Sequence, residues 1–271
     1  MEAVNLNREV VTLDQLGVSI VVDSAGDQAS TAVVVWLHSE WGTFDEPPLS
    51  EEVLSRARVL VVHQPGWGVS TGEERLFTLA DVALAYWTVL DRLGVGSALL
   101  AGHGIGATVV AEMTVQQPAR VRSALLVAPF GLWDDEVGGE DIFALMPKDA
   151  LPHLYADVDS DLRMRHFPST NDPHERGLAG IRRAQTLGPA SRYLYPLPET
   201  GIRDRLYRMA DVPVELIWGA EDGVVPLAMA DQWLSLLPRA GKVVVPNAAH
   251  MVAYETDAVS TCCVRHLDAP G

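Results

Sequence analysis

Cysteine is scarce in this 271-residue chain, and so is positive charge. The two cysteines, Cys262 and Cys263, are neighbours in a predicted helix, where adjacent side chains point in different directions, so we expect no disulfide between them. Lysine and arginine number 20 against 36 aspartates and glutamates, which gives a formal net charge of −16. Because an acidic surface repels phosphate backbones, the composition argues against nucleic acid as a partner.

Long apolar runs are also absent. None reaches the roughly 18 residues that a membrane-spanning helix needs, and the stretch Met1 to Glu9 is polar where a signal peptide would be apolar. We therefore expect a soluble, cytoplasmic protein without a membrane partner. The histidines and cysteines show no metal-ligand spacing, so we predict no metal and no cofactor, only a small-molecule substrate or ligand. The oligomeric state stays open.

Hydrophobic patterning predicts strands that alternate with helices. An antiparallel hairpin is expected from Val10–Leu13 and Val18–Val22, followed by buried strands whose runs are continuously apolar. Such alternation is typical of parallel strands joined by right-handed crossovers, so the predicted fold is an α/β fold with a mostly parallel sheet and helices on both faces. The further strands are expected at 31–38, 58–63, 97–101, 121–128, 214–218 and 242–245, and the helices at 49–57, 78–93, 105–117, 226–237 and 252–266.

The alternation breaks after the sixth strand, at Phe130. Residues 131–209 are rich in Pro, Asp, Arg and His and contain only weak helical patterns, at Asp149–Tyr155 and Glu175–Thr186. We expect this stretch to form a helical lid inserted into a core made of residues 1–130 and 210–271. The lid histidines, His153, His166 and His174, lack the spacing of metal ligands and are expected to be exposed.

One glycine-rich turn organises the rest of the chain. An apolar strand runs into Gly102-His103-Gly104-Ile105-Gly106, and a helical pattern runs out of it, which is the context of a nucleophile elbow. The residue at the centre of such a turn has strained backbone angles, and its crowded flanks require small neighbours. Here the centre is Gly104, which has no side chain. The elbow is predicted, but its Ser, Cys or Asp nucleophile is missing.

Five stretches together resemble the α/β-hydrolase family, in particular its lidded esterases and carbon–carbon bond hydrolases. Each follows a predicted strand, at the edge of the sheet where substrate sites of open α/β folds lie. They are 36–42 (WLHSEWG), 63–70 (HQPGWGVS), the elbow, 218–222 (WGAED) and 247–250 (NAAH). The resemblance covers nearly the whole chain.

The resemblance implies roles for five positions. Asp222 matches the acid of a catalytic triad, His250 matches its base, and Gly104 stands at the nucleophile position. The backbone N–H groups of Ile105 and Glu40 match the two donors of an oxyanion hole. The sequence departs from the family pattern at Ser39 and Ala249, where glycine is usual, and at Glu40, whose carboxylate beside an anion hole makes electrostatic sense only if it points away.

Several alternatives stay open around this site. Ser39 could be a displaced nucleophile, and Asp134 or Asp135 could supply the acid instead of Asp222. His103 either packs behind the turn or faces the substrate. The tryptophans on the loops either pack the lid or line an apolar pocket. The residues that we expect to line this pocket are His38, Ser39, Trp41, His103 and Trp133, with Trp67 nearby.

Three functions are compatible with an elbow that has no nucleophile. In the first, His250 and Asp222 act as a general base on a small, largely apolar substrate, as in a lyase or cyclase. In the second, a water molecule occupies the space left by Gly104, and His250 activates it for direct hydrolysis. In the third, the protein is a non-catalytic binding or regulatory relative. A substitution of the nucleophile introduced to trap a substrate would leave the same glycine.

Overall fold

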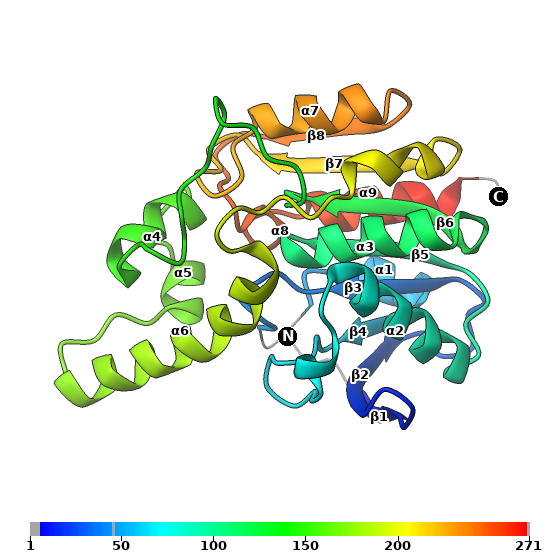
Figure 1. Ribbon diagram of the computed structural model, residues 1–271, viewed down its shortest axis with the longest axis horizontal. Helices are drawn as coiled ribbons and strands as arrows, with labels where there is room; N and C mark the ends of the chain where they lie inside the picture. The colour runs from blue at the N-terminus through cyan, green and yellow to red at the C-terminus, as the bar shows by residue number, and fades with distance from the viewer. Residues whose placement is uncertain (1–5, 45–46, 270–271) are drawn as a thin grey trace.

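The computed structural model describes residues 6–44 and 47–269, and its centre is an eight-stranded sheet (Figure 1). The strand order is β1-β2-β4-β3-β5-β6-β7-β8. β1 and β2 form the predicted antiparallel hairpin, β2 pairs with β4 antiparallel, and all other neighbours are parallel. The strands are β1 (Asn7–Leu13), β2 (Val18–Gly26), β3 (Val33–Leu37), β4 (Arg58–Val62), β5 (Ala98–His103), β6 (Val121–Val127), β7 (Val214–Gly219) and β8 (Gly241–Val245).

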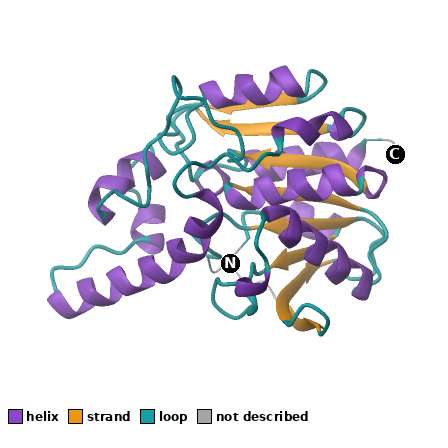
Figure 2. Ribbon diagram, in the orientation of Figure 1, coloured by secondary structure: helices purple, strands orange, loops and turns teal. Residues whose placement is uncertain are grey.

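Helices cover both faces of the sheet, as expected for parallel crossovers (Figure 2). One face packs against α2 (Leu79–Arg92), α3 (Ile105–Gln116) and α7 (Ala228–Leu236), and the other packs against α1 (Glu51–Arg56), α8 (Val252–Glu255) and α9 (Ala258–Asp268). The two apolar layers between them are separate clusters of buried side chains. Three short 3₁₀ turns complete the layers, η1 (Glu73–Arg75), η2 (Pro118–Arg120) and η3 (Arg203–Met209).

A capping box explains where α2 starts. The hydroxyl of Thr78 accepts the N–H of Asp81, while the Asp81 carboxylate accepts the N–H of Thr78, at 2.8 Å. The C-terminal helix is a correction. We predicted one helix over 252–266, but the backbone becomes extended at Thr256 and separates α8 from α9. Cys262 and Cys263 are free and buried in α9.

The chain between β6 and β7 forms three helices that lie beyond the carboxyl ends of the parallel strands (Figure 1). They are α4 (Pro147–Leu154), α5 (Asp161–His166) and α6 (Pro173–Leu194). The weak patterns at 149–155 and 175–186 predicted α4 and α6, but α5 was not predicted. We call residues 131–209 the inserted segment; its role as a lid stays a prediction. Among the described residues, no helix is both long enough and apolar enough to cross a membrane.

Candidate active site

The elbow has the backbone geometry that the sequence predicts. β5 ends at His103, Gly104 has φ +55° and ψ −120°, and α3 begins at Ile105. A Cβ atom on Gly102 would collide with the carbonyl oxygen of Gly106, and one on Gly106 would collide with carbonyl oxygens at the end of β3. The small residues are therefore required by close backbone contacts, and a side chain at position 104 would have unfavourable backbone angles.

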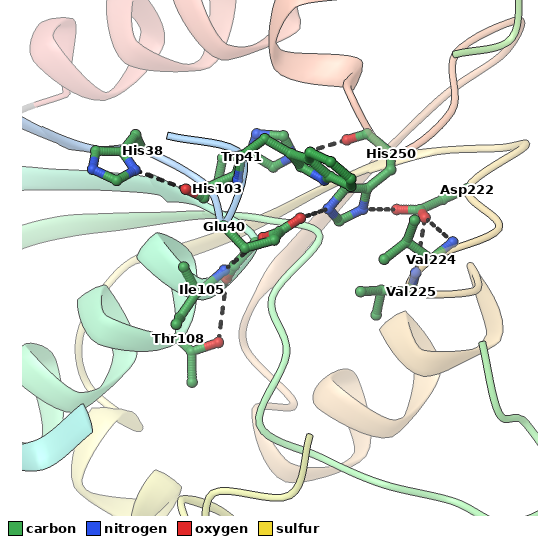
Figure 3. A network of polar contacts seen from close by, with 12 residues as sticks. His38, Glu40, Trp41, His103, Ile105, Thr108, Asp222, Val224, Val225 and His250 are labelled. Carbon is green, nitrogen blue, oxygen red and sulfur yellow. Dashed lines mark hydrogen bonds and ion pairs between the residues drawn. The ribbon is translucent and has the colours of Figure 1, made fainter. Parts of the chain in front are cut away.

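The predicted acid and base are in hydrogen-bond contact. Asp222 lies in the loop after β7 and His250 in the loop after β8, with 2.9 Å between Asp222 Oδ2 and His250 Nδ1. The other carboxylate oxygen of Asp222 accepts the backbone N–H groups of Val224 and Val225, at 2.9 and 2.8 Å. These bonds fix the carboxylate so that it orients the imidazole ring, as Figure 3 shows. The alternative acids, Asp134 and Asp135, bond to Gln232 and to Trp133.

Glu40 is the principal surprise of the site. We expected its carboxylate to point away, but it points inward (Figure 3): Oε1 lies 2.9 Å from His250 Nε2, and Oε2 accepts the N–H of Ile105 at 3.3 Å. A Cβ atom on Gly104 would collide with Oε2 of Glu40. The carboxylate thus occupies the space of the missing side chain, which the second of our three hypotheses assigns to a water molecule. The N–H of Ile105, predicted as an oxyanion donor, meets this carboxylate.

The two carboxylates determine the protonation state of the histidine. Burial alone would lower the pKa of His250, but the charges of Asp222 and Glu40 and their hydrogen bonds outweigh it and raise this pKa to about 10. Burial likewise opposes ionisation of Glu40, but the charge of His250 and its hydrogen bond lower the pKa of that carboxyl. At neutral pH the site is therefore an imidazolium between carboxylates, with a net charge of −1 from two negative groups and one positive group.

Two further histidines brace the site without being charged. His38 is fully buried, accepts the backbone N–H of Gln64 at Nε2 and lies 2.7 Å from the carbonyl oxygen of Ser39 at Nδ1. His103 is also fully buried, and its Nε2 donates to the carbonyl oxygen of His250 at 2.8 Å. Burial lowers the pKa of His38 to about 4 and that of His103 to about 3. Both rings were named as pocket residues, with packing behind the turn as the alternative for His103; in the structure they fix the backbone of the loops that carry Glu40 and His250.

The remaining predicted pocket residues have different surroundings. The hydroxyl of Ser39 accepts the N–H of Trp41, so His250 contacts Glu40 and not the serine that we considered as a displaced nucleophile. The indole of Trp41 packs edge-on against Phe167 of the inserted segment. Trp133 is half-buried, and its indole N–H donates to Asp135. The structure therefore brings Ser39 and Trp41 to the site, whereas the indole of Trp133 bonds within the inserted segment.

The site is closed to solvent. The side chains of Glu40, His250 and Asp222 are 0% exposed. Backbone hydrogen bonds join α4 to the two loops that carry Asp222 and His250. The N–H of Met251 donates to the carbonyl oxygen of Leu154, and the N–H of Gly223 donates to that of His153. Two buried polar atoms near the site, Trp41 Nε1 and His103 Nδ1, have no hydrogen-bond partner in the described parts of the chain. Unpaired buried groups are unusual in native structures and mark sites where a ligand or water would be accommodated.

A cavity of about 220 Å³ lies elsewhere, next to a second histidine–aspartate pair. Asp23 of β2 contacts His63, which follows β4, at 2.6 Å, and it also accepts two hydrogen bonds from Arg8 of β1. Phe44 and Tyr254 complete the cavity wall. This cavity does not include any of the three residues of the Glu40–His250–Asp222 site.

Comparison with known proteins settles the family. Residues 33–257 match the family model described as the alpha/beta hydrolase fold. The chain belongs to the α/β-hydrolase family. Over 219 residues, 78% of the chain, it is 26% identical to the dihydrolipoyllysine-residue acetyltransferase component of the acetoin cleaving system of Pseudomonas putida. The chain spans only 55% of the length of that relative.

Solved α/β-hydrolase structures share the fold at low sequence identity. A bacterial membrane phospholipase A matches with a TM-score of 0.75 and 19% identity, over 97% of this chain and 87% of that chain. Naproxen esterase from Bacillus subtilis matches with a TM-score of 0.72 and 19% identity, over 98% and 92%. At these identities the likeness shows the fold alone.

Proposed function

We propose that this α/β-hydrolase uses the carboxylate of Glu40 in place of the missing elbow side chain. One observation carries the proposal: Oε2 of Glu40 occupies the space that a side chain on Gly104 would take, while Oε1 contacts His250 Nε2. In a serine-based triad the base contacts the nucleophile through this nitrogen. Glu40 is therefore the electron-pair donor, His250 carries the proton, and Asp222 positions the imidazole.

This assignment changes the first two hypotheses drawn from the sequence. A free imidazole would be the base in both, but His250 is an imidazolium whose Nε2 already contacts a carboxylate. The proton acceptor in the resting state is consequently Glu40, and His250 becomes a base only when the charge of Glu40 is removed. The reaction class is hydrolysis of a small, largely apolar substrate, in keeping with the family to which the chain belongs.

Substrate entry requires the inserted segment to move, because the reacting side chains have no exposed surface. The backbone hydrogen bonds that the loops of His250 and Asp222 donate to Leu154 and His153 would have to break. Apolar side chains on both sides of the site suit a largely apolar substrate: Trp41 follows Glu40 directly, and the ring of Phe130 lies 5.9 Å from that of His250.

A buried cluster of unbalanced charge is expensive, which favours a catalytic role over a structural one. Removing charges from water costs several kcal/mol per ion, and perturbed titratable groups of this kind gather at functional sites. The competing function, a non-catalytic relative, is favoured by the closed site, in which Glu40 satisfies both His250 and the N–H of Ile105. The catalytic function predicts that Glu40 is needed for turnover, whereas the non-catalytic function predicts that Glu40 is needed only for stability.

The test compares Glu40→Gln with Glu112→Gln. Glu112 of α3 is a matched control, because it is a buried glutamate that pairs with Arg205 of η3 and not with a residue of the elbow. Hydrolysis is measured on p-nitrophenyl butyrate, 1-bromohexane and styrene oxide. Turnover of at least one substrate should fall about 10²–10⁴-fold in Glu40→Gln and persist in Glu112→Gln.

The melting temperature gives a second readout for the same variants. A glutamine at position 40 can donate to a neutral His250 and accept the N–H of Ile105, so the stability change should stay within about 1 kcal/mol. Activity that is equal in both variants, or a Glu40→Gln protein that is strongly destabilised and binds ligand unchanged, would favour the non-catalytic relative.

A further inference from the structure

We propose that the cavity beside the Asp23–His63 pair binds a small carboxylic acid with a compact, aromatic body. The residues of the Glu40–His250–Asp222 site do not line this cavity, so the inference goes beyond the proposed function and does not depend on it. Three properties of the cavity carry it: the unpaired nitrogens in its wall, the aromatic rings in the rest of the wall, and its volume.

The polar wall of the cavity comes from one edge of the sheet. Arg8 lies in β1, Asp23 lies in β2, and His63 directly follows β4. The carboxylate of Asp23 accepts three hydrogen bonds, from Nε of Arg8 at Oδ1 and from both Nη2 of Arg8 and Nε2 of His63 at Oδ2. Because its oxygens are bound and the guanidinium balances its charge, Asp23 positions the other two groups and does not itself bind the ligand.

Arg8 and His63 each have a nitrogen available to a ligand. Nη1 of Arg8 and Nδ1 of His63 have no hydrogen-bond partner within residues 6–44 and 47–269. A guanidinium nitrogen can only donate, whereas Nδ1 of a neutral ring accepts, because Nε2 carries the hydrogen that binds Asp23. The two side chains share the acceptor Oδ2 of Asp23, so they are neighbours in the wall. A ligand group that both accepts and donates can therefore bridge them.

A carboxylic acid group has this combination. Its carbonyl oxygen accepts from the guanidinium of Arg8, and its hydroxyl donates to Nδ1 of His63; a carboxylate on a protonated ring is the same complex after the proton moves. In either form the complex gains no net charge, which suits a chain whose formal net charge is −16. An ammonium group is disfavoured, because Arg8 would repel it and the oxygens of Asp23 are already bound.

The rest of the wall is largely aromatic. Trp36 of β3, Phe44 in the loop after β3 and Tyr254 of α8 all line the cavity. The rings of Phe44 and Tyr254 meet edge to face, with 5.0 Å between their centroids. Aromatic rings prefer edge-to-face and offset contacts with one another, so this part of the wall favours a flat ring in the ligand.

The volume limits the ligand to one ring with a short acid substituent. The cavity measures about 220 Å³. An apolar protein cavity of about 150 Å³ is large enough to bind benzene. The additional space accommodates a carboxyl group on a short linker, so phenylacetate is the probe that fits both the volume and the polar wall.

Calorimetric titration with phenylacetate tests the site. Affinity should fall about 10–100-fold in Arg8→Gln, because a hydrogen bond to a charged group is lost. Thr43→Phe should abolish binding, because Thr43 lines the cavity from an exposed position and a larger side chain there fills the space without entering the core. Arg75→Gln is the control, since Arg75 is an exposed arginine of η1 outside the cavity. Glu40→Gln should bind like the wild type.

Two further probes test the ligand class in the wild type. Phenylacetamide has the same shape and hydrogen-bonding pattern but no charge, so it should bind about 10-fold more weakly. Acetate lacks the ring and should lose at least about 10-fold in affinity, because it buries almost no apolar surface. Thr43→Phe leaves Arg8, Asp23 and His63 unchanged, so its result stands even where Arg8→Gln lowers the melting temperature.

Each contrary result overturns a different step. Absence of phenylacetate binding to the wild type overturns the site. Binding that is lost in Glu40→Gln but persists in Arg8→Gln and Thr43→Phe places the acid in the Glu40 site and overturns the location. Phenylacetamide that binds as tightly as phenylacetate overturns the carboxylic acid as the ligand class. None of these results depends on whether hydrolysis requires Glu40, so the two proposals fail independently.

Discussion

Two histidine–aspartate pairs lie in this fold, and residues of opposite charge complete them. At Asp23–His63 the third residue is Arg8, which binds the aspartate through two hydrogen bonds and has a half-exposed side chain. At Asp222–His250 the third residue is Glu40, which binds the histidine and is fully buried. In the first cluster the guanidinium of Arg8 balances the charge of Asp23. In the second cluster Glu40 places a second carboxylate next to the histidine that already contacts Asp222.

The difference separates a structural arrangement from the site that we propose to be reactive. Burial opposes ionisation of Asp23, but the hydrogen bonds from Arg8 and His63 outweigh it and lower the pKa of that carboxyl. Asp23 would keep Arg8 even without its histidine. In the second cluster the imidazolium lies between two carboxylates, so both ion pairs there depend on His250. Loss of the proton from His250 would remove both ion pairs at once, so the charge balance of this site responds to a single protonation event.

The largest expected effect comes from removing each histidine. His250→Gln leaves two buried carboxylates without a cation and should lower the free energy of unfolding by about 3–5 kcal/mol. His63→Gln leaves Asp23 paired with Arg8 and should cost about 1 kcal/mol. Urea denaturation of both variants measures the difference. Equal losses in the free energy of unfolding would show that the two pairs make the same contribution to stability.

The next effect tests whether Glu40 truly occupies the elbow space. Gly104→Ala brings a Cβ atom into the Glu40 carboxylate at a positive φ, and should cost about 2–3 kcal/mol. Gly201→Ala is the control, because its φ is +72° and nothing lies within 4 Å of an added Cβ, so it should cost about 1 kcal/mol.

A double-mutant cycle separates the collision from the backbone strain. In a Glu40→Ala background, the penalty for Gly104→Ala should fall to that of the Gly201→Ala control, because the obstructing carboxylate is gone. Unchanged penalties in the two backgrounds would mean that the carboxylate does not lie above Gly104.

The last effect is a dependence of stability on pH. Because the pKa of His250 is raised from 6.5 to about 10, its stabilising contribution is complete below pH 6.5 and is lost as the pH rises toward 10. The pKa of Glu40 is lowered, so its contribution is present above pH 4.5 and is lost as the pH falls through the depressed value. The melting temperature of the wild type should therefore fall between pH 6.5 and 10 more steeply than that of His250→Gln. Parallel curves would contradict the raised pKa.

Local sequence patterns were enough to predict most of the fold. Buried stretches such as 33–37 and 59–62 are continuous apolar runs, and the glycine-rich turn at 102–106 requires its conformation for steric reasons that are visible in the sequence. The roles of Asp222 and His250 came instead from the resemblance to the α/β-hydrolase family, which places each of them after a strand at the edge of the sheet where the elbow lies. Short elements were harder: α5 has six residues, and the break at Thr256 lies in a three-residue polar stretch, Glu255 to Asp257, between two segments with apolar residues.

The role of Glu40 could not be predicted, although both halves of the signal were present. The sequence shows a missing side chain at Gly104 and an unexpected carboxylate at position 40. Which way that carboxylate points depends on the space above Gly104 and on the proton held by His250, and both exist only in the folded chain. The missing side chain at Gly104 and the carboxylate at Glu40 indicate a substitution of one for the other only once the fold places these two positions together.

The charge state of His250 in wild type and Glu40→Gln is the measurement that tests the central claim most directly. ¹⁵N-detected NMR of histidine-labelled protein at pH 8, with the His250 signals assigned by their absence in His250→Gln, reports protonation of both ring nitrogens. We predict an imidazolium in the wild type and a neutral ring in Glu40→Gln, because the carboxylate of Glu40 helps to hold the proton. A ring that is neutral in both proteins, or charged equally in both, would contradict the claim that Glu40 has taken the place of the elbow side chain.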